Sequence, residues 1–195
     1  MRRTSGVRAL RFWAIAAVLS TAAAHAQSGS WILGVGVGQG SGWPTCASCA
    51  TISHRQGLSG YGEIERALSP TVAVGVELSR WANYQSDANS QFDAGLIVGT
   101  LTAEPGRGIA LTIGAGVAQN RVDFISPSGQ DLSTGFAYLA GLAYRFPLTS
   151  RFTLSPFGDY TATAGAQATA PFGSGTETYS FNGNLLRFGI ELAWR

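Results

Sequence analysis

The last residues of the chain alternate strictly between large apolar side chains and polar or small ones. Every second position is large and apolar: Leu186, Phe188, Ile190, Leu192 and Trp194. The positions between them hold Arg187, Gly189, Glu191 and Ala193. A period of two is typical of a β-strand with one apolar face and one polar or small face. Such a strand fits a soluble β-sandwich as well as a membrane barrel, and the rest of the chain decides between them.

The other end of the chain has the three parts of an export signal. Residues 1–11 carry four arginines and no acid, residues 12–19 form a short apolar run, and residues 24–26 read Ala-His-Ala, which has the form of a cleavage site. The apolar run is too short to span a bilayer comfortably as a helix. We therefore expect residues 1–26 to be a signal peptide that is removed, and residues 27–195 to form one exported domain.

The composition of the mature chain excludes several classes of protein. Without the four arginines of the signal peptide, nine basic residues face 11 acidic ones, so the net charge is about −2 and gives no case for nucleic-acid binding. No mature stretch approaches 18 consecutive apolar residues, so no transmembrane helix is expected. A closed β-barrel is another way for an exported, apolar, glycine-rich chain to be stable.

Alternating segments recur about every 20 residues along the mature chain. Eight are expected to be strands: 31–40, 58–68, 72–79, 92–103, 109–117, 136–145, 152–162 and 184–194. An even number of strands is what closure of an antiparallel bacterial barrel requires. The pattern predicts an all-β fold, an eight-stranded antiparallel up-and-down transmembrane β-barrel.

The connections between these segments alternate in length. Those after the second, fourth and sixth segments are tight turns, such as Ser69-Pro70-Thr71. The others are long and polar: 41–57, 82–90, 120–133 and 164–182. Transmembrane barrels have short periplasmic turns and longer extracellular loops, so we expect both termini on the periplasmic side.

The cost of placing charge in lipid predicts which face of each strand is which. An ionised side chain that faces lipid at mid-bilayer costs about 2–4 kcal/mol for arginine and somewhat less for acids. Six charged residues on the faces opposite the apolar rows are therefore expected inside the barrel: Glu63, Glu65, Glu77, Arg145, Arg187 and Glu191. An eight-stranded barrel has room only for its own side chains, so opposite charges would pair there and close the lumen.

Aromatic residues fall near the ends of the predicted strands, as expected for rings that prefer the headgroup zone. Four of them are expected at the periplasmic membrane interface: Trp31, Tyr144, Phe152 and Trp194. A second group is expected near the other rim: Trp81, Phe92, Phe124, Phe136, Tyr160 and Phe181. Alternation places Trp81 on the same face as Glu77, and a bulge or a rim position would resolve this conflict.

Three segments carry a resemblance to a known family. They are Ile64–Leu78, Tyr144–Pro147 and the terminal Leu186–Trp194. With them the chain resembles the small eight-stranded outer-membrane β-barrel proteins of Gram-negative bacteria, the OmpA/OmpX/opacity-protein type, over essentially its whole mature length. The resemblance implies the cell outer membrane as location and outer-membrane lipid, lipopolysaccharide and the barrel-assembly machinery as partners. It does not fix a function, because members serve as adhesins, tethers, resistance factors and occasionally enzymes.

Few residues suggest catalysis. Cys46-Ala-Ser-Cys49 lies in the first long connection, where a small local disulfide is favoured over a redox pair, which needs a helix N-terminus. His54 is the only histidine of the mature chain and has no carboxylate pattern beside it to orient the ring. We therefore expect no catalytic residue, no metal and no cofactor.

The resulting hypothesis is a monomeric, non-enzymatic outer-membrane barrel with a structural or surface-interaction role through its loops. Two alternatives stay open: a narrow porin-like channel, and a lipopolysaccharide-modifying enzyme. The sequence names no extracellular ligand.

Overall fold

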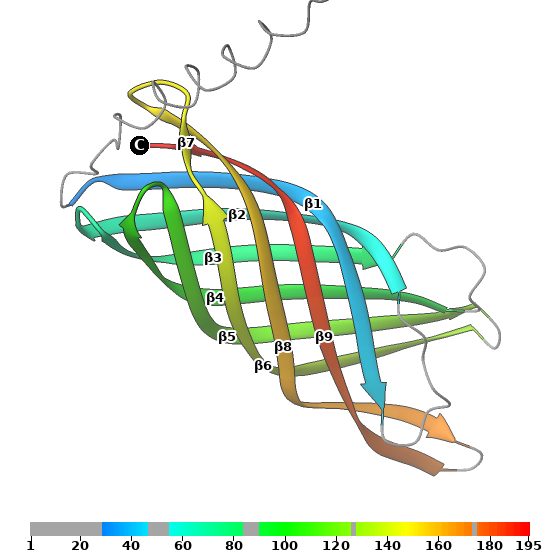
Figure 1. The fold of residues 1–195 in the computed structure, drawn as a ribbon. Coiled ribbons are helices and arrows are strands. Elements are labelled where there is room, and N and C mark those ends of the chain that lie inside the picture. The colour runs from blue at the N-terminus through cyan, green and yellow to red at the C-terminus, as the bar shows by residue number, and fades with distance from the viewer. Residues whose placement is uncertain (1–28, 47–54, 84–89, 126–127, 173–174) are drawn as a thin grey trace, which may run out of the picture.

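The computed structural model describes residues 29–46, 55–83, 90–125, 128–172 and 175–195 (Figure 1). The expected signal peptide, residues 1–26, lies outside the described residues. The described chain forms nine β-strands and no helix. Their bounds are β1 Trp31–Cys46, β2 Arg55–Ser69, β3 Val72–Asn83, β4 Ser90–Gly106, β5 Ile109–Ile125, β6 Ser128–Tyr144, β7 Phe146–Pro147, β8 Phe152–Phe172 and β9 Gly175–Trp194.

The strands close into a barrel in which every pairing is antiparallel. The order runs β6-β5-β4-β3-β2-β1-β9-β8-β7, and a further pairing of β6 with β8 closes the ring. The two-residue β7 follows β6 after Arg145, and both pair with β8. They therefore occupy one position in the wall, and the barrel has eight positions, as the sequence pattern predicts. All eight predicted strands are present.

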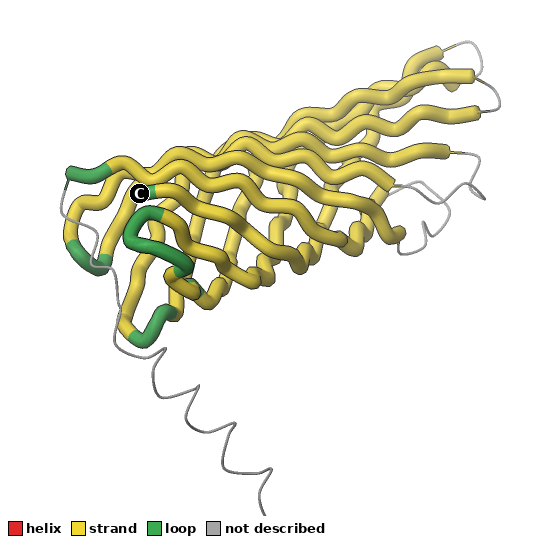
Figure 2. Tube along the Cα trace, turned by 90° about the horizontal axis from the view of Figure 1, so that it is seen from above, coloured by secondary structure: helices red, strands yellow, loops and turns green. Residues whose placement is uncertain are grey.

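The short connections gather at the end of the barrel that holds the C-terminus (Figure 2). The hairpin between β2 and β3 turns at Pro70 and Thr71, and the one between β4 and β5 turns at Arg107 and Gly108. Gly106, Arg107 and Gly108 have φ values of 121°, 57° and 78°, so three successive residues of this turn have positive φ, which glycine adopts readily. The amide of Gly29 is held at the same end by the carbonyl of Ala67, at 2.6 Å.

The opposite end differs from the sequence-based prediction. Much of what was expected to be long loops is paired strand: Asn120 lies opposite Ser133, and Ile125 opposite Ser128. Likewise β8 and β9 pair from Gln167 and Ser180 out to Phe172 and Gly175, and Figure 1 shows them extending together past the barrel. Polar Ser, Thr and Gln residues in these segments suggested loops, but antiparallel backbone pairing needs no apolar face. The two ends of the barrel therefore differ in how far the paired strands extend, and they extend further at the end away from the C-terminus.

The strands turn most of their large apolar side chains outward and many small or polar ones inward, but Leu96, Val98 and Leu139 form a buried apolar cluster inside the barrel. In β5 the outward residues include Leu111, Ile113 and Val117, and each is exposed. The inward residues on either side of this stretch, Ala110 and Ala118, are buried. The described residues contain no helix that is long and apolar enough to cross a membrane.

Candidate functional site

The barrel interior is the candidate functional site, because the inward positions bring charged side chains from distant parts of the chain together. Inward glycines make room for them. At Gly36 of β1, an added Cβ would lie 2.1 Å from the ring of Tyr61 on β2. At Gly34 it would lie 2.7 Å from the side chain of Glu63. The glycine-rich β1 is therefore a wall against which the larger side chains of β2 lie.

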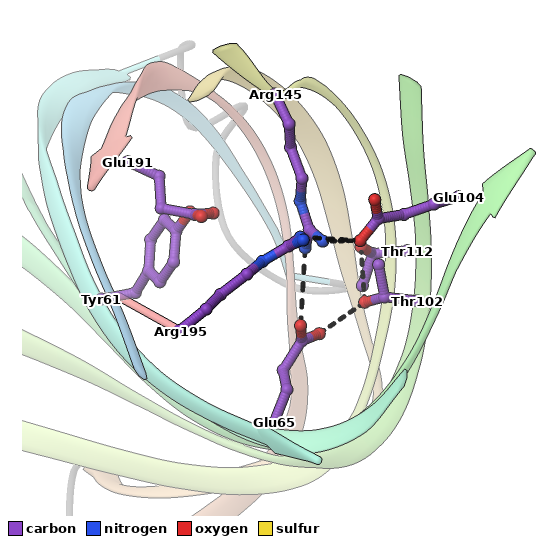
Figure 3. Close-up of polar contacts among 8 residues, drawn as sticks. All are labelled: Tyr61, Glu65, Thr102, Glu104, Thr112, Arg145, Glu191 and Arg195. Carbon is purple, nitrogen blue, oxygen red and sulfur yellow. Dashed lines mark hydrogen bonds and ion pairs between the residues drawn. The ribbon is translucent and has the colours of Figure 1, made fainter. Parts of the chain in front are cut away.

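A first group, the turn-end cluster, lies near the short turns and is drawn in Figure 3. It consists of Glu65, Thr102, Thr112, Glu104, Arg145 and Arg195. Glu104 accepts hydrogen bonds from both guanidinium groups, that of Arg145 and that of Arg195, the latter at 2.9 Å. Glu65 accepts from Thr102 at 2.6 Å and forms an ion pair of 3.5 Å with Arg145. Two carboxylates and two guanidinium groups thus balance each other and connect β2, β4, the β6–β7 junction and the C-terminal residue.

A second group, the central cluster, surrounds Arg187 of β9. The Arg187 side chain is fully buried, and it donates to Asp159 of β8 at 2.7 Å and to Glu77 of β3 at 2.8 Å. Its Cζ lies 5.5 Å from the centroid of the Tyr61 ring, which is within the range of a cation–π contact. The Tyr61 hydroxyl donates to Glu191 at 2.7 Å. The central cluster therefore connects β2, β3, β8 and β9 across the lumen.

Trp81 fills the barrel beyond the central cluster. Its side chain is fully buried on the same face as Glu77, and its Nε1 donates to the carbonyl of Gly40 at 3.1 Å. Glycines leave the space for the indole, because a Cβ at Gly40 or Gly42 would lie 2.7 or 2.9 Å from it. The expectation that a bulge or rim position would take Trp81 off this face is wrong: β3 pairs without a register shift at this point, and neighbouring glycines accommodate the ring inside.

Two cavities among these interior side chains are small. A cavity lined by Tyr61, Glu63, Glu77 and Glu191, among others, measures about 40 Å³, and one beside Trp81 measures about 10 Å³. A cavity needs roughly 10–15 Å³ of accessible volume to hold a single water molecule. The Oε1 atoms of Glu63 and Glu191 are buried without a hydrogen-bond partner among the described residues, so the larger cavity suits a few water molecules that would bind them.

The structure places all six of the charged residues singled out in the sequence on the inner face. Five of them make the contacts given above, and Glu63 lines the central cavity. Sequence reasoning did not assign the partners Tyr61, Asp159, Glu104, Arg195 and Thr102. Asp159 could have been found by alternation, because it lies two residues from Phe157 and Thr161 on the inner face. Arg195 could not, since it follows the last strand.

The four aromatic residues expected at the periplasmic interface all lie on the outside. Trp31, Tyr144, Phe152 and Trp194 are exposed near the end with the short turns. The guanidinium of Arg66 lies 5.7 Å from the Trp31 ring centroid. At the other rim, Phe136 and Tyr160 are exposed, whereas the side chains of Phe92, Phe124 and Phe181 lie outside the described part of the chain. The same holds for the expected disulfide between Cys46 and Cys49 and for His54.

The turn-end cluster and the central cluster consist of carboxylates paired with guanidinium and hydroxyl groups. Within the described ranges, no three His, Cys, Asp or Glu side chains are arranged to hold a metal ion. Buried ion pairs contribute little net stability, but removing one partner leaves an uncompensated buried charge. The clusters connect strands that are far apart in the sequence, from β2 to β9, across the lumen.

The closed eight-stranded antiparallel barrel, apolar outside and charged inside, is the fold of the small outer-membrane β-barrel proteins. No protein-family model matches the chain, and no curated protein matches it. Several solved structures are similar, among them the following two. Neisserial surface protein A has 12% identity and a TM-score of 0.55, covering 82% of this chain and 95% of that one. Ail, the attachment invasion locus protein of Yersinia pestis, has 12% identity and a TM-score of 0.53, covering 86% of this chain and 99% of that one. At such identities the likeness establishes the fold.

Proposed function

We propose that the protein is an integral outer-membrane barrel that neither conducts nor catalyses, and that it acts through the surfaces it displays. The observation that carries the proposal is the pairing of an apolar outer belt with a lumen filled by side chains. The belt on β9 runs from Leu186 to Trp194. Eight residue steps of ~3.3 Å, tilted by ~40°, span about 20 Å along the membrane normal, close to the ~25 Å apolar band of transmembrane barrels.

The filled lumen argues against the channel alternative. Water and ions would have to pass Arg187 and Trp81, both fully buried, and the cavities around them hold at most a few water molecules. The enzyme alternative lacks support as well: within the described residues, Glu65, Glu77, Asp159 and Glu191 contact arginine or tyrosine, and no histidine lies beside them or beside Glu63.

The extended hairpins are the surfaces proposed to interact with other molecules. The β5–β6 and β8–β9 hairpins continue beyond the apolar belt, at the end away from the C-terminus. In this proposal both termini and the short turns face the periplasm, and the hairpins face the medium. We further propose that the partners of the protein are ligands of these hairpins and the barrel-assembly machinery, and that the protein is a monomer.

Labelling of single cysteines on intact cells tests the proposed topology. In a background with Cys46 and Cys49 replaced by serine, Ser128→Cys at the tip of β5–β6 is expected to react with a membrane-impermeant maleimide. Ser150→Cys, in an exposed turn at the other end, is expected to react only after lysis. The protein is expected in the outer-membrane fraction, with a gel mobility that changes on boiling. Recovery in the soluble periplasmic fraction, or labelling of Ser150→Cys alone, would refute the proposal.

A further inference from the structure

Within the described ranges, Glu63 is an inward carboxyl group that forms no ion pair with a basic side chain. The central cavity is lined by four carboxyl groups: Glu63, Glu77, Asp159 and Glu191. One guanidinium group, that of Arg187, forms ion pairs with Glu77 and Asp159. The Oε1 atom of Glu63 is buried and has no hydrogen-bond partner among the described residues. A buried charge without a partner is costly, so the charge state of Glu63 requires a physical explanation.

The strands on either side of Glu63 offer it no positive charge. Glu77 lies directly opposite on β3, and like charges on directly opposite residues of one face are destabilising. The inward neighbours of Glu63 along β2 are Tyr61 and Glu65. On the β1 side, the Glu63 carboxyl group lies against Gly34, where an added Cβ would be 2.7 Å from Oε1. The immediate neighbours of Glu63 are therefore carboxylates, a phenol and a glycine.

The donors around the cavity are directed at other carboxylates. The donors with their acceptors are Arg187 with Glu77 and Asp159, Arg145 with Glu65 and Glu104, Arg195 with Glu104, and Tyr61 with Glu191, several of them drawn in Figure 3. The Nη1 atom of Arg187 has no acceptor among the described residues, so it is a donor for water in the cavity. The walls from β5 and β6 contribute uncharged residues, such as Thr112 and Leu139.

We propose that Glu63 is a proton-binding site of the folded barrel and is a neutral carboxylic acid at neutral pH. When two carboxyl groups share a buried site, one of them keeps its proton, because like charges so close together cannot both ionise. The protonated group also gains an O–H donor. The cavity of about 40 Å³ has room for water that connects this donor to the buried Oε1 atom of Glu191, which likewise has no partner among the described residues. Loss of the proton at alkaline pH would place a negative charge beside Glu77 and loosen the central cluster.

Infrared spectroscopy of the reconstituted barrel tests the proton directly, because the carbonyl stretch of a protonated carboxyl group is distinct from the bands of carboxylates. The wild type is expected to show this band at neutral pH and to lose it when the pH is raised. Glu63→Gln should remove the band, and Glu63→Asp, which keeps an acid at the site, should shift it. Glu77→Gln is the matched control on the opposite strand and should leave the band in place.

The same pair of glutamines separates the two glutamates by stability. Glutamine resembles a protonated glutamate in shape and charge, so Glu63→Gln should leave the urea midpoint of unfolding at neutral pH unchanged or higher. Glu77→Gln should lower that midpoint by roughly 0.5 M or more, because Arg187 loses one of its buried carboxylates.

The pH dependence of unfolding gives a third readout. A solvated glutamate in the unfolded chain releases its proton above about pH 4.3, whereas the folded barrel keeps it. Stability therefore falls with rising pH wherever only the folded state binds the proton. Between about pH 5 and about pH 9, the urea midpoint of the wild type should fall relative to that of Glu63→Gln.

Three results would overturn the proposal. The first is a wild-type spectrum at neutral pH with no carboxyl band that Glu63→Gln removes. The second is equal destabilisation by Glu63→Gln and Glu77→Gln. The third is stabilisation of the wild type by sodium, potassium or magnesium ions at constant ionic strength that Glu63→Gln abolishes, since a metal cation would then occupy the site in place of the proton.

Discussion

Arg187 shows at the residue scale how the lumen depends on complementary charge. Its guanidinium is fully buried, yet it has a carboxylate on each of two other strands and an aromatic ring beside it. An isolated charge in this position would cost far more than its hydrogen bonds return. Among the ion pairs of the described residues, those of Glu77 and Asp159 are both with Arg187, so the removal of Arg187 affects both carboxylates.

We expect Arg187→Leu to destabilise the barrel by about 3–5 kcal/mol, since Glu77 and Asp159 lose the buried positive charge between them. Urea unfolding in lipid vesicles, followed by tryptophan fluorescence, measures the change. Arg66→Leu is the control, because the Arg66 side chain is exposed outside the barrel. The triple variant Glu77→Gln, Asp159→Asn, Arg187→Leu should recover part of the loss. A loss in the triple variant equal to the sum of the single losses would contradict the network.

Glycines on the inner face leave space for neighbouring side chains, whereas glycines on the outer face have open space beside them. A pair of substitutions measures how this difference affects the free energy of unfolding. Gly36→Val should destabilise the barrel by about 1–3 kcal/mol, because its Cβ would overlap the Tyr61 ring and displace the hydroxyl from Glu191. Gly62→Val, one strand away and facing outward, should be neutral or stabilising. The same urea unfolding reports both values. Equal destabilisation by the two variants would show that the space around each glycine does not decide its role.

At the scale of the strand, alternation in the sequence predicted the strands of the barrel well, because side chains that face lipid and side chains that face the lumen occupy alternate positions. All eight strands, the two faces and the inward position of Arg187 follow from it. Alternation did not predict how far the strands extend at the end away from the C-terminus. Pairs there, such as Asn120 with Ser133, are held by backbone hydrogen bonds, which require no alternation of apolar and polar residues. Alternation also could not predict which charged side chains pair with each other. Glu77 and Arg187 are 110 residues apart in the sequence, and only the closure and register of the barrel bring them together.

The extended hairpins should be separable from the barrel. Replacing residues 168–179 of the β8–β9 hairpin by an Asn-Gly turn removes pairs beyond Gln167 and Ser180 but leaves the Asp159–Arg187 pairing in place. We expect the shortened protein to insert and to unfold within about 1 kcal/mol of the wild type, because the hairpin lies outside the apolar belt. Heat-dependent gel mobility and urea unfolding measure this. Failure of the shortened chain to insert would mean that the extension takes part in barrel folding.

At the scale of the whole molecule, closure couples the strands to the lumen. β1 pairs with β9 and β6 with β8, so no edge of the sheet is left unpaired in the belt region. An eight-stranded barrel is just wide enough for its interior side chains, and here they include Trp81, Tyr61, the two charged clusters and the apolar cluster of Leu96, Val98 and Leu139. The same small diameter lets Arg187 of β9 reach partners on β3 and β8.

The filled lumen predicts that the wild-type barrel forms no steady pore in planar bilayers. Replacing the side chains that block it, by Trp81→Gly, Tyr61→Ser and Arg187→Ser together with Glu77→Gln and Asp159→Asn, should produce a measurable conductance, because polar side chains and water would occupy the vacated volume. The paired acids are neutralised in this variant so that no unpartnered charge unfolds the barrel. A matched variant with only Glu77→Gln and Asp159→Asn keeps the bulky groups and should stay closed. A steady open pore in the wild type would establish the channel function in place of the proposed one.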